Sequence, residues 1–445
     1  MMKRINKEFK NLSLFSLGKL VSVFGSLIYS FAMSLYILKV TGDGLSFATN
    51  LVIGILPIVI ISPFAGVLAD RLNRKLIVII MDVLSGILLI GLYVYINQNG
   101  LYILTIYITT FILTVFGVIF NICLESAKPE IVTKKRLMTI NSISKIIGST
   151  SSILAPIMGG VIYALVEKNV FDIEIFIMIN GLSFLFSAFS ELFIDFDINN
   201  SKAIKKLEET EKIDDMETKV EHEDNHSFLS NIVDGFNYLK NHSQLKSLIS
   251  FFIIINFFTG LALLVPLPYI INEVLALDAT YFGIIQGAFP VGMILGALVV
   301  KKVSDHIPYD QLLSRMILLS SFIMMLIGVP LLVPMLFPTG IYYLVFYSLV
   351  MILFGIIVAF VDIPIMYLLQ SLVDDNYRGR VMSLAMSLAK ITSPLALLLS
   401  GILINNVSPW ILPILGGGLQ LLFCVYRIIM SKKQYLHTQN LKASA

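Results

Sequence analysis

The segment Gly66-Val67-Leu68-Ala69-Asp70-Arg71-Leu72-Asn73-Arg74-Lys75 stands between two long runs of Leu, Ile, Val and Phe. It begins with small residues and ends with one acidic and three basic side chains. The apolar runs on both sides are long enough to cross a bilayer as helices. We therefore predict that this segment is a short polar loop between two membrane spans, and that the chain is a helical membrane protein.

The composition of the whole chain supports this prediction. Of its 445 residues, 57% are hydrophobic and 14% are charged, whereas about 25% are charged in a typical soluble domain. Crossing the hydrocarbon core takes roughly 20 apolar residues as a helix, and about twelve such stretches occur. They cover residues 13–38, 48–69, 76–96, 101–125, 138–165, 173–194, 247–271, 281–300, 313–335, 340–371, 381–404 and 408–430. An all-α membrane protein is expected, and a soluble globular protein is excluded.

The distribution of Lys and Arg predicts the orientation, because positive residues in short loops stay on the cytoplasmic side. With the amino terminus inside, the external loops carry only Lys39 and Lys168 of the 32 basic residues. The apolar stretch after the basic start is too long for the hydrophobic region of a signal peptide, so we interpret it as the first span. We expect a multi-pass protein of the cell membrane, with both termini cytoplasmic, the lipid bilayer as partner and no nucleic acid.

One long polar interval divides the spans into two sets of six. Residues 196–246 are rich in charge and poor in apolar side chains, which favours a solvated linker. Its last part, residues 228–240, has helical spacing of apolar residues and predicts a surface helix. His222 and His226 lie four residues apart among carboxylates, but a solvated charge run is favoured over a metal site. The predicted domains are 1–195, a first six-helix bundle; 196–246, an acidic cytoplasmic linker; 247–430, a second bundle; and 431–445, a cytoplasmic tail.

The two halves share a repeat. At a separation of about 230 residues Gly66 and Leu68 match Gly296 and Leu298, and at about 245 residues Lys145 matches Lys390, as expected for duplicated transporter halves. Asp70 has no acidic counterpart, because the equivalent position is Val300. We predict two pseudo-symmetric bundles that differ in this loop.

The run G-x-L-x-D-R-x-x-R-K resembles the loop signature of the major facilitator superfamily, whose members are alternating-access transporters. The resemblance implies that Asp70 binds the start of span 11, where a helix N-terminus favours negative charge. The resulting cytoplasmic clasp would use Gly66, Asp70, Arg71, Arg74 and Lys75 on one side and Arg378, Gly379 and Arg380 on the other. The alternative is that the basic residues only satisfy the positive-inside rule, which leaves Gly66 and Asp70 unexplained.

A second motif, Ala155-Pro156-Ile157-Met158-Gly159-Gly160, resembles the G-P-x-x-G-G motif of the antiporter branch of this superfamily. Proline removes a backbone donor, and glycines permit close helix approach, which suits a helix packed against the opposite half. Ala155 departs from the family pattern. The resemblance implies export by antiport; the alternative is that Pro and Gly are simply common in membrane helices.

Charged residues inside spans cost about 2.5–3.5 kcal/mol each and are candidates for proton coupling. Asp362 and Lys390 lie at similar depth on consecutive spans, so they could form an ion pair that acts as a proton switch or only fixes packing. Asp82 could partner Arg74 or Lys19, with a structural role favoured. Span 4 lacks the intramembrane Arg that is expected from the drug-antiporter pattern. Asp362 is therefore the first candidate for proton coupling, and Glu125 is the second. The full candidate set is Asp362, Lys390, Glu125, Lys145, Lys19 and Asp82.

Spans 1, 7 and 10 line the central pathway in the resembled fold, and here they are rich in aromatic residues. A wall with few fixed polar groups favours bulky hydrophobic or cationic solutes over sugars. The predicted cavity residues are Tyr29, Tyr36, Phe257, Phe258, Phe354 and Tyr367.

The loops Pro129-Glu130-Ile131-Val132 and Tyr377-Arg378-Gly379-Arg380 resemble those of the macrolide-efflux and siderophore-exporter group. We therefore expect a monomeric, proton-coupled exporter of hydrophobic or cationic small molecules that works by rocking of its two bundles. No G-x-x-x-x-G-K-[ST] motif occurs, so an ion gradient should supply the energy, and no cofactor is expected. A siderophore or lipid transporter of the same fold remains an alternative. A membrane enzyme is disfavoured because no catalytic residues cluster in the sequence.

Overall fold

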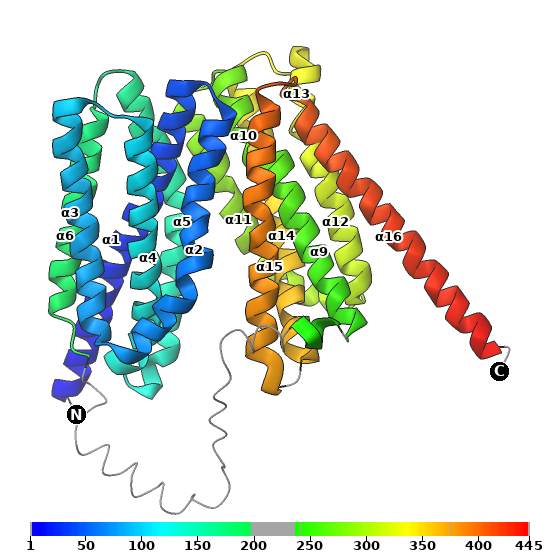
Figure 1. Ribbon diagram of the computed structural model, residues 1–445, viewed down its shortest axis with the longest axis horizontal. Coiled ribbons are helices and arrows are strands. Elements are labelled where there is room, and N and C mark those ends of the chain that lie inside the picture. Colours follow the sequence, from blue (N-terminus) through cyan, green and yellow to red (C-terminus); the bar gives the residue numbers. More distant parts are fainter. Residues whose placement is uncertain (1, 197–235, 241, 374, 444–445) are drawn as a thin grey trace, which may run out of the picture. The chain divides into compact units, whose positions relative to one another are not determined.

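The computed structural model describes residues 2–196, 236–240, 242–373 and 375–443, and this part of the chain forms helices and turns without a strand (Figure 1). The first half contains α1 (Met2–Thr41), α2 (Gly44–Arg71), α3 (Arg74–Asn99), α4 (Ile103–Ile131), α5 (Leu137–Glu167) and α6 (Ile173–Leu192). The second half contains α9 (Ser243–Thr259), η2 (Gly260–Leu264), α10 (Pro266–Tyr269), η3 (Ile270–Val274), α11 (Ala279–Ser304), α12 (Tyr309–Leu326), α13 (Val329–Leu332), η4 (Pro334–Leu336), α14 (Gly340–Leu372), α15 (Asp375–Ile404) and α16 (Ile411–Ala443). A short η1 turn (Lys134–Arg136) precedes α5.

The helices have the length and composition of membrane spans. Within the described ranges, 11 segments are long and apolar enough to cross a membrane, and α15 adds a shorter apolar stretch at Lys390–Ile404. Each predicted span coincides with one of these segments. The expected all-α membrane fold with twelve spans is confirmed.

The turn between α2 and α3 occupies the middle of the signature segment. Only Leu72 and Asn73 lie between the two helices. The side chain of Asn73 accepts a hydrogen bond from the backbone N–H of Leu76 at 3.2 Å and so caps the start of α3. The signature is therefore a tight interhelical turn, as its polar residues predict.

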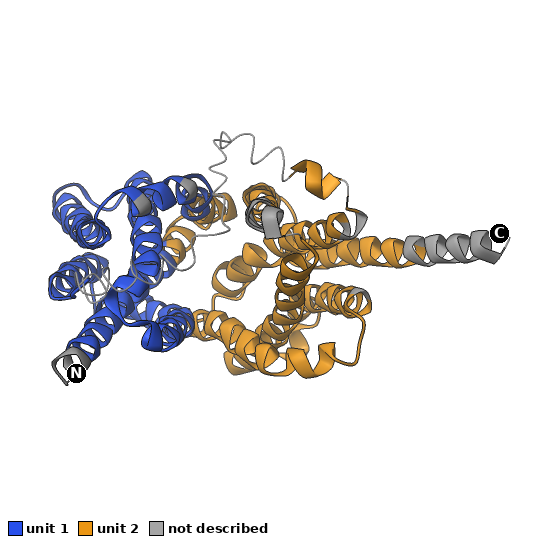
Figure 2. Cartoon of the chain, turned by 90° about the horizontal axis from the view of Figure 1, so that it is seen from below, with its two compact units in different colours: residues 1–33, 53–227 blue, residues 34–52, 228–445 orange. Residues whose placement is uncertain are grey.

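Two compact units make up the chain, one formed by residues 1–33 and 53–227 and the other by residues 34–52 and 228–445 (Figure 2). The assignment of residues 34–52 to the second unit was not predicted from the sequence. Its cause is close packing on α15, where a Cβ on Gly401 would lie 2.8 Å from the Cβ of Ala48. The predicted linker, residues 196–246, falls mostly outside the described residues.

Helices α11 and α14 of the second unit touch through their backbones. A Cβ added to Gly292 would lie 2.1 Å from the carbonyl oxygen of Ile352, and one on Gly355 would lie 2.2 Å from that of Phe289. Small residues allow membrane helices to approach this closely. No larger side chain fits at either glycine without separating the two helices.

The span predicted at 247–271 is interrupted. It consists of α9, the π-helical segment η2, the short α10 and a second π-helical segment, η3. Pro266 and Pro268 lack backbone N–H groups, so α-helical hydrogen bonding cannot continue unbroken there. Ser400 of α15 donates a hydrogen bond to the carbonyl oxygen of Leu261 at 2.8 Å. A side chain from a neighbouring helix thus supports the irregular backbone, as membrane-buried helix breaks require.

Candidate functional site

Helices α1, α2 and α4 of the first unit surround a cavity of about 460 Å³. Its wall is mostly apolar, and no residue that lines it carries a charge. Seven side chains with polar atoms interrupt this wall: Ser26, Tyr29, Ser30, Ser62, Thr110, Thr114 and Asn121. A largely apolar concave surface with a few polar groups is typical of a small-molecule site.

Three polar side chains of the cavity wall, Ser62, Thr114 and Asn121, use part of their hydrogen-bonding capacity on their own helices. The hydroxyl of Thr114 donates to the carbonyl oxygen of Thr110 at 2.7 Å, and Ser62 donates to the carbonyl of Ile58. A hydroxyl has one hydrogen and two acceptor sites. Ser62 and Thr114 therefore have acceptor capacity left over, and they favour a ligand that brings O–H or N–H donors.

The predicted repeat relates this cavity to a helix contact in the second half. At the separations given by the sequence, Ser62 corresponds to Gly292, and Thr110 corresponds to Gly355. In the second unit these two glycines bring α11 and α14 into backbone contact. In the first unit the same positions carry side chains that line the cavity. Positions that the predicted repeat relates therefore form a closed contact in one unit and line a cavity in the other.

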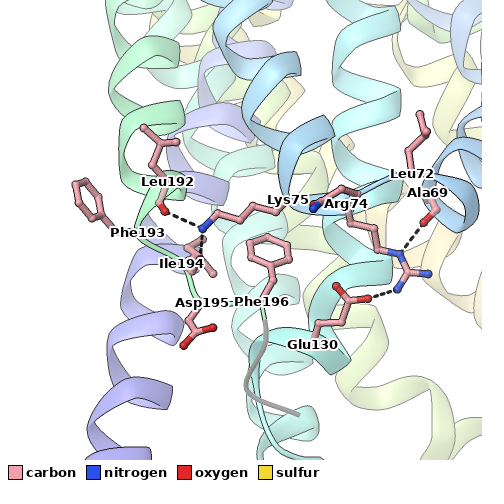
Figure 3. A pocket seen from close by; sticks show the side chains of 11 residues that line it. Ala69, Leu72, Arg74, Lys75, Glu130, Leu192, Phe193, Ile194, Asp195 and Phe196 are labelled. Carbon is pink, nitrogen blue, oxygen red and sulfur yellow. Dashed lines mark hydrogen bonds and ion pairs between the residues drawn. The ribbon is translucent and has the colours of Figure 1, made fainter. Parts of the chain in front are cut away.

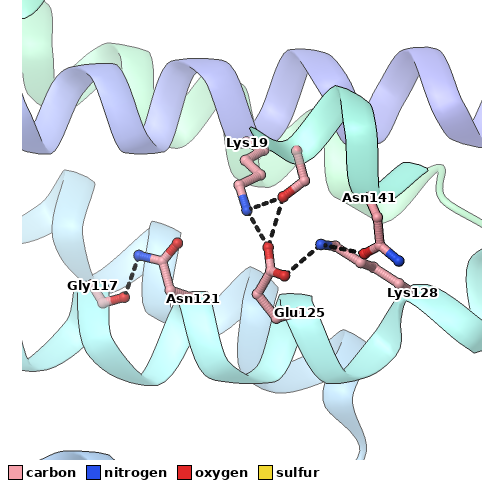
Figure 4. A network of polar contacts seen from close by, with 7 residues as sticks. Lys19, Gly117, Asn121, Glu125, Lys128 and Asn141 are labelled. Atoms are coloured by element: carbon pink, nitrogen blue, oxygen red, sulfur yellow. Dashed lines mark hydrogen bonds and ion pairs between the residues drawn. The ribbon is translucent and has the colours of Figure 1, made fainter. Parts of the chain in front are cut away.

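A network of charged residues lies on α4, one turn beyond the cavity (Figure 4). The carboxylate of Glu125 binds the ammonium groups of Lys19 on α1 and Lys128 on α4. Ser144 of α5 donates to Glu125 at 2.7 Å, and Lys128 donates to the side chain of Asn141 at 3.0 Å. The lysine side chains are 7% and 6% exposed, whereas Glu125 is 46% exposed. One half-exposed carboxylate thus balances two buried cations and ties three helices together.

The predicted gating cations Arg74 and Lys75 are engaged within the first unit, at the edge of a cavity of about 550 Å³ (Figure 3). Arg74 binds Glu130 of α4 at 2.7 Å and donates to backbone carbonyls on α2 and α4. Lys75 donates to the carbonyl oxygens of Leu192 and Ile194, at 2.8 and 2.7 Å. These contacts fasten the α2–α3 turn to α4 and to the end of α6.

The clasp between the signature loop and span 11 stays a prediction. Arg71 is exposed, and Gly66 has no atom within 4 Å of its Cβ position in the described part of the chain. The side chains of Asp70, Arg378 and Arg380, and the surroundings of Gly379, lie outside what the structure describes.

Asp82 has neither of the partners proposed for it from the sequence. Arg74 binds Glu130, and Lys19 binds Glu125, so both cations are directed elsewhere. Asp82 is 2% exposed and shares a hydrogen bond with Ser22 of α1. The pairing prediction is wrong because sequence depth does not specify which face of α3 the carboxylate occupies.

Of the other predicted coupling residues, Lys19 and Glu125 are paired, but Asp362, Lys390 and Lys145 do not join them. Asp362 of α14 is partly buried, Lys390 of α15 is exposed, and no ion pair joins these two described side chains. Lys145 is exposed on α5, and Glu125 takes its two cations from Lys19 and Lys128 instead. The role of these residues in coupling stays a prediction.

The six predicted aromatic residues occupy different environments. Tyr29 is buried and lines the first-unit cavity. Phe354 is 1% exposed, with its ring beside that of Phe289 between α11 and α14. Tyr367 is 54% exposed and lies beside Tyr309. Partial burial is shared by the remaining three, Tyr36, Phe257 and Phe258.

The motif on α5 packs against α1 within its own unit. Ala155, Gly159 and Gly160 are buried, and Pro156 is accommodated inside the helix. A Cβ on Gly159 would lie 2.6 Å from the ring of Phe31 on α1. The prediction was packing against the opposite half; the contact that the structure describes at Gly159 instead seats an aromatic ring of α1.

Sequence reasoning missed three residues of these sites. Lys128 lies three positions after Glu125 on one helix, a spacing that favours ion pairing and was available as a signal. Glu191 of α6 is a buried carboxylate beside Asp82, and it falls inside the span predicted at 173–194, where the rule on intramembrane charge applies to it. Ser144 offers no such signal, because its role depends on how α5 packs on α4.

Two curated proteins resemble this chain at low identity over most of its length. Macrolide efflux protein A of Streptococcus pyogenes is 22% identical over 393 residues, which are 88% of each chain. The uncharacterized MFS-type transporter YfiS of Bacillus subtilis (strain 168) is 23% identical over 387 residues, 84% of this chain and 80% of that protein.

Solved structures share the fold. The nucleoside transporter NupG superposes with a TM-score of 0.67 at 14% identity, covering 96% of this chain and 99% of that chain. The D-xylose-proton symporter superposes with a TM-score of 0.63 at 10% identity, covering 94% and 96%. These relatives are transporters and not enzymes. The profile of the Major Facilitator Superfamily matches residues 15–397, and the chain belongs to that superfamily of membrane transporters.

Proposed function

We propose that this transporter is a secondary active exporter of hydrophobic or cationic small molecules, driven by proton antiport with rocker-switch alternating access. It would act as a monomer in the cell membrane with both termini in the cytoplasm, as the distribution of Lys and Arg indicates. The observation that carries the proposal is the uncharged, mostly apolar cavity between α1, α2 and α4.

The chemistry of the cavity favours a large apolar ligand that carries hydrogen-bond donors. Its volume of about 460 Å³ accommodates a drug-sized molecule or a substantial part of one. The spare acceptor sites of Ser62 and Thr114 suit hydroxyl or ammonium groups on such a ligand. A hydroxylated macrolide or an amphipathic cation has this combination, and the similarity to macrolide efflux protein A points the same way.

Two features support export by antiport. The α5 motif resembles that of the antiporter branch, and the chain has no phosphate-binding loop for nucleotide hydrolysis. For coupling we retain Asp362, a partly buried carboxylate on α14. By the repeat, Asp362 corresponds to Gly117, which lines the cavity in the first half.

The proposal is tested by transport in proteoliposomes that contain the full chain. A labelled macrolide and a labelled cationic dye are supplied in parallel, with and without an imposed pH gradient. We expect accumulation only with the gradient, in the direction opposite to proton flow. Accumulation that ignores the gradient would rule out antiport, and accumulation of sugars in preference to both probes would rule out the substrate class.

A matched pair of variants tests the site. Gly117 lines the cavity and Gly91 does not, and each has open space at its Cβ position among the described atoms. Gly117→Leu fills part of the cavity, so we expect a rise of tenfold or more in the KM for the macrolide. Gly91→Leu adds the same side chain on α3 and should leave the KM unchanged. Equal kinetics for the two variants would show that the substrate does not use this cavity.

A further inference from the structure

Two carboxylates that belong neither to the wall of the 460 Å³ cavity nor to the Glu125 network are buried together inside the first unit. Asp82 of α3 is 2% exposed, and Glu191 of α6 is 1% exposed. They are close enough for their charges to interact. Two ionised carboxylates at such a position would each lose hydration without gaining a counter-charge, so the environment favours a bound cation or proton.

A chain of hydrogen bonds connects this pair to α1. Ser22 contacts Asp82, the hydroxyl oxygens of Ser22 and Ser187 are 2.9 Å apart, and Ser187 lies 3.1 Å from the carbonyl oxygen of Gly18. The chain therefore has three oxygen–oxygen contacts, but the two hydroxyls supply only two hydrogens. A protonated Asp82 supplies the third hydrogen: Asp82 donates to Ser22, Ser22 donates to Ser187, and Ser187 donates to the carbonyl of Gly18.

Glu191 lies beside Gly18 and Ser187, at the end of this hydrogen-bond chain. Neither of its carboxylate oxygens has a hydrogen-bond partner among the residues that the structure describes. A Cβ on Gly18 would lie 3.0 Å from one of these oxygens and 3.4 Å from the hydroxyl of Ser187. The glycine on α1 thus leaves the room that the carboxyl group of Glu191 occupies.

No described cation of the three surrounding helices is paired with either carboxylate. Five cations of α1 and α3 whose side chains the structure describes have other partners: Lys7 binds Asp195, Lys10 lies over the ring of Phe193, Lys19 binds Glu125, Arg74 binds Glu130, and Lys75 binds two carbonyl groups. On α6, Glu174 lies in the first turn, at the opposite end of the helix from Glu191. The proton is the simplest charge that this site can bind, because no group of three or more His, Cys, Asp or Glu side chains that could hold a metal ion occurs among the described residues.

We propose that Asp82, Glu191, Ser22 and Ser187 form a proton-binding site of the first unit, which exchanges its proton with the cytoplasmic side. This assignment rests on the proposed antiport function and adds to it a second titratable site besides Asp362. The nearest described cavity on the chain is the one of about 550 Å³ beside the signature turn, which is lined by Leu192, the residue after Glu191 (Figure 3).

The hydrogen-bond chain transmits the state of the site to α1. When Asp82 releases its proton, Ser22 donates to the new carboxylate, and Ser187 then donates to Ser22. The carbonyl oxygen of Gly18 loses its donor in this rearrangement. Gly18 directly precedes Lys19, which holds the Glu125 network on α4. Proton release therefore removes the hydrogen bond from Ser187 of α6 to Gly18 of α1 and so weakens the contact between these helices next to Lys19 of the Glu125 network.

Infrared difference spectroscopy tests the site without any substrate. The full chain in lipid is compared between acid and alkaline buffers within the pH range where it stays folded, in an Asp362→Asn background. We expect a carbonyl stretching band of a protonated carboxylic acid that disappears as the pH rises. Asp82→Asn combined with Glu191→Gln should abolish this change, and Ser85→Ala, which removes a buried hydroxyl of α3 bonded to its own helix, should keep it. An unchanged band in the double variant, a band that never titrates, or a band displaced by sodium ions at constant pH would each overturn the proposal.

Transport separates this inference from the proposed function. If Asp82→Asn with Glu191→Gln loses gradient-driven accumulation but keeps substrate exchange without a gradient, the site carries a coupled proton. If the double variant keeps full gradient-driven accumulation, the coupling part of the inference is wrong while antiport stands. If the wild type itself shows no gradient-driven accumulation but the infrared band titrates, antiport fails and the proton-binding site stands.

Discussion

Removing the charge of Glu125 should destabilise the first unit more than removing either of its lysine partners. Glu125→Gln leaves the ammonium groups of Lys19 and Lys128, on side chains that are 7% and 6% exposed, without a counter-charge. Breaking a fully buried pair costs about 3–5 kcal/mol, and an exposed pair contributes about 0–1 kcal/mol. Because Glu125 is 46% exposed, we expect an intermediate loss of about 1–3 kcal/mol. Lys19→Met should cost less, because Glu125 keeps Lys128 and Ser144 as partners.

The double variant gives the sharper comparison. Adding Lys19→Met to Glu125→Gln removes one of the two uncompensated cations, so it should restore part of the lost stability. The assay is thermal unfolding followed by a thiol-reactive dye at buried Cys123 of α4, in a Cys424→Ser background. A loss of 1 kcal/mol lowers the midpoint by about 2–4 °C for a unit of this size. A double variant less stable than Glu125→Gln would refute the reasoning.

Three further outcomes follow from other contacts. Gly296→Ala places a Cβ 2.8 Å from that of Ala359 and should lower stability by about 1–3 kcal/mol. Its control is Gly66→Ala, at the position that the predicted repeat relates to Gly296, where the added Cβ meets no described atom within 4 Å and should be neutral or stabilising. Equal shifts of the melting temperature in the two variants would contradict this prediction. Burial alone raises the pKa of Asp43, but hydrogen bonds, chiefly from Ser46, outweigh it and hold that pKa below its usual value. Asp43 therefore stabilises the folded state at neutral pH, this contribution is lost as the pH falls through the lowered pKa, and Asp43→Asn should flatten the acid side of a melting profile against pH. Arg74→Lys keeps the charge, but the lysine cannot contact Glu130 and the two carbonyl groups at the same time as the guanidinium does. The variant should therefore lose about 1–3 kcal/mol of stability and transport more slowly. Wild-type flux in that variant would show that transport does not require the turn to be fastened.

The sequence predicts the architecture well because hydropathy and charge act locally. Span positions, the turn at Leu72 and Asn73, and the repeat all follow from residue type along the chain. The sequence predicts the break at η2 only in part. Pro266 and Pro268 indicate that the helix is interrupted, but they do not predict the π-helical segments around the interruption. The transfer of residues 34–52 to the second unit could not be predicted, because it depends on the meeting of Ala48 and Gly401 across the fold.

The candidate sites show the same limit more strongly. Because Lys19 and Glu125 are charged residues inside predicted spans, the sequence identifies both as candidates for proton coupling. In the structure they form an ion pair. Rotation about each helix axis then decides the partners, and the sequence does not give it. Asp82 consequently faces Ser22 rather than a cation, and Lys145 turns outward although its neighbour Ser144 joins the network.

The backbone contact between α11 and α14 also bears on how a duplicated transporter can diversify. At Gly292 and Gly355 even one added methyl group would meet a carbonyl oxygen, so the range of tolerated mutations there is very narrow. Ser62 and Thr110, at the related positions, face open volume and can be exchanged for residues of other size and polarity. If the halves arose by duplication, the α11–α14 contact would have kept its sequence while the related positions of the first half could vary. Mutant libraries that aim to alter the transported substrate should therefore randomise positions on α2 and α4.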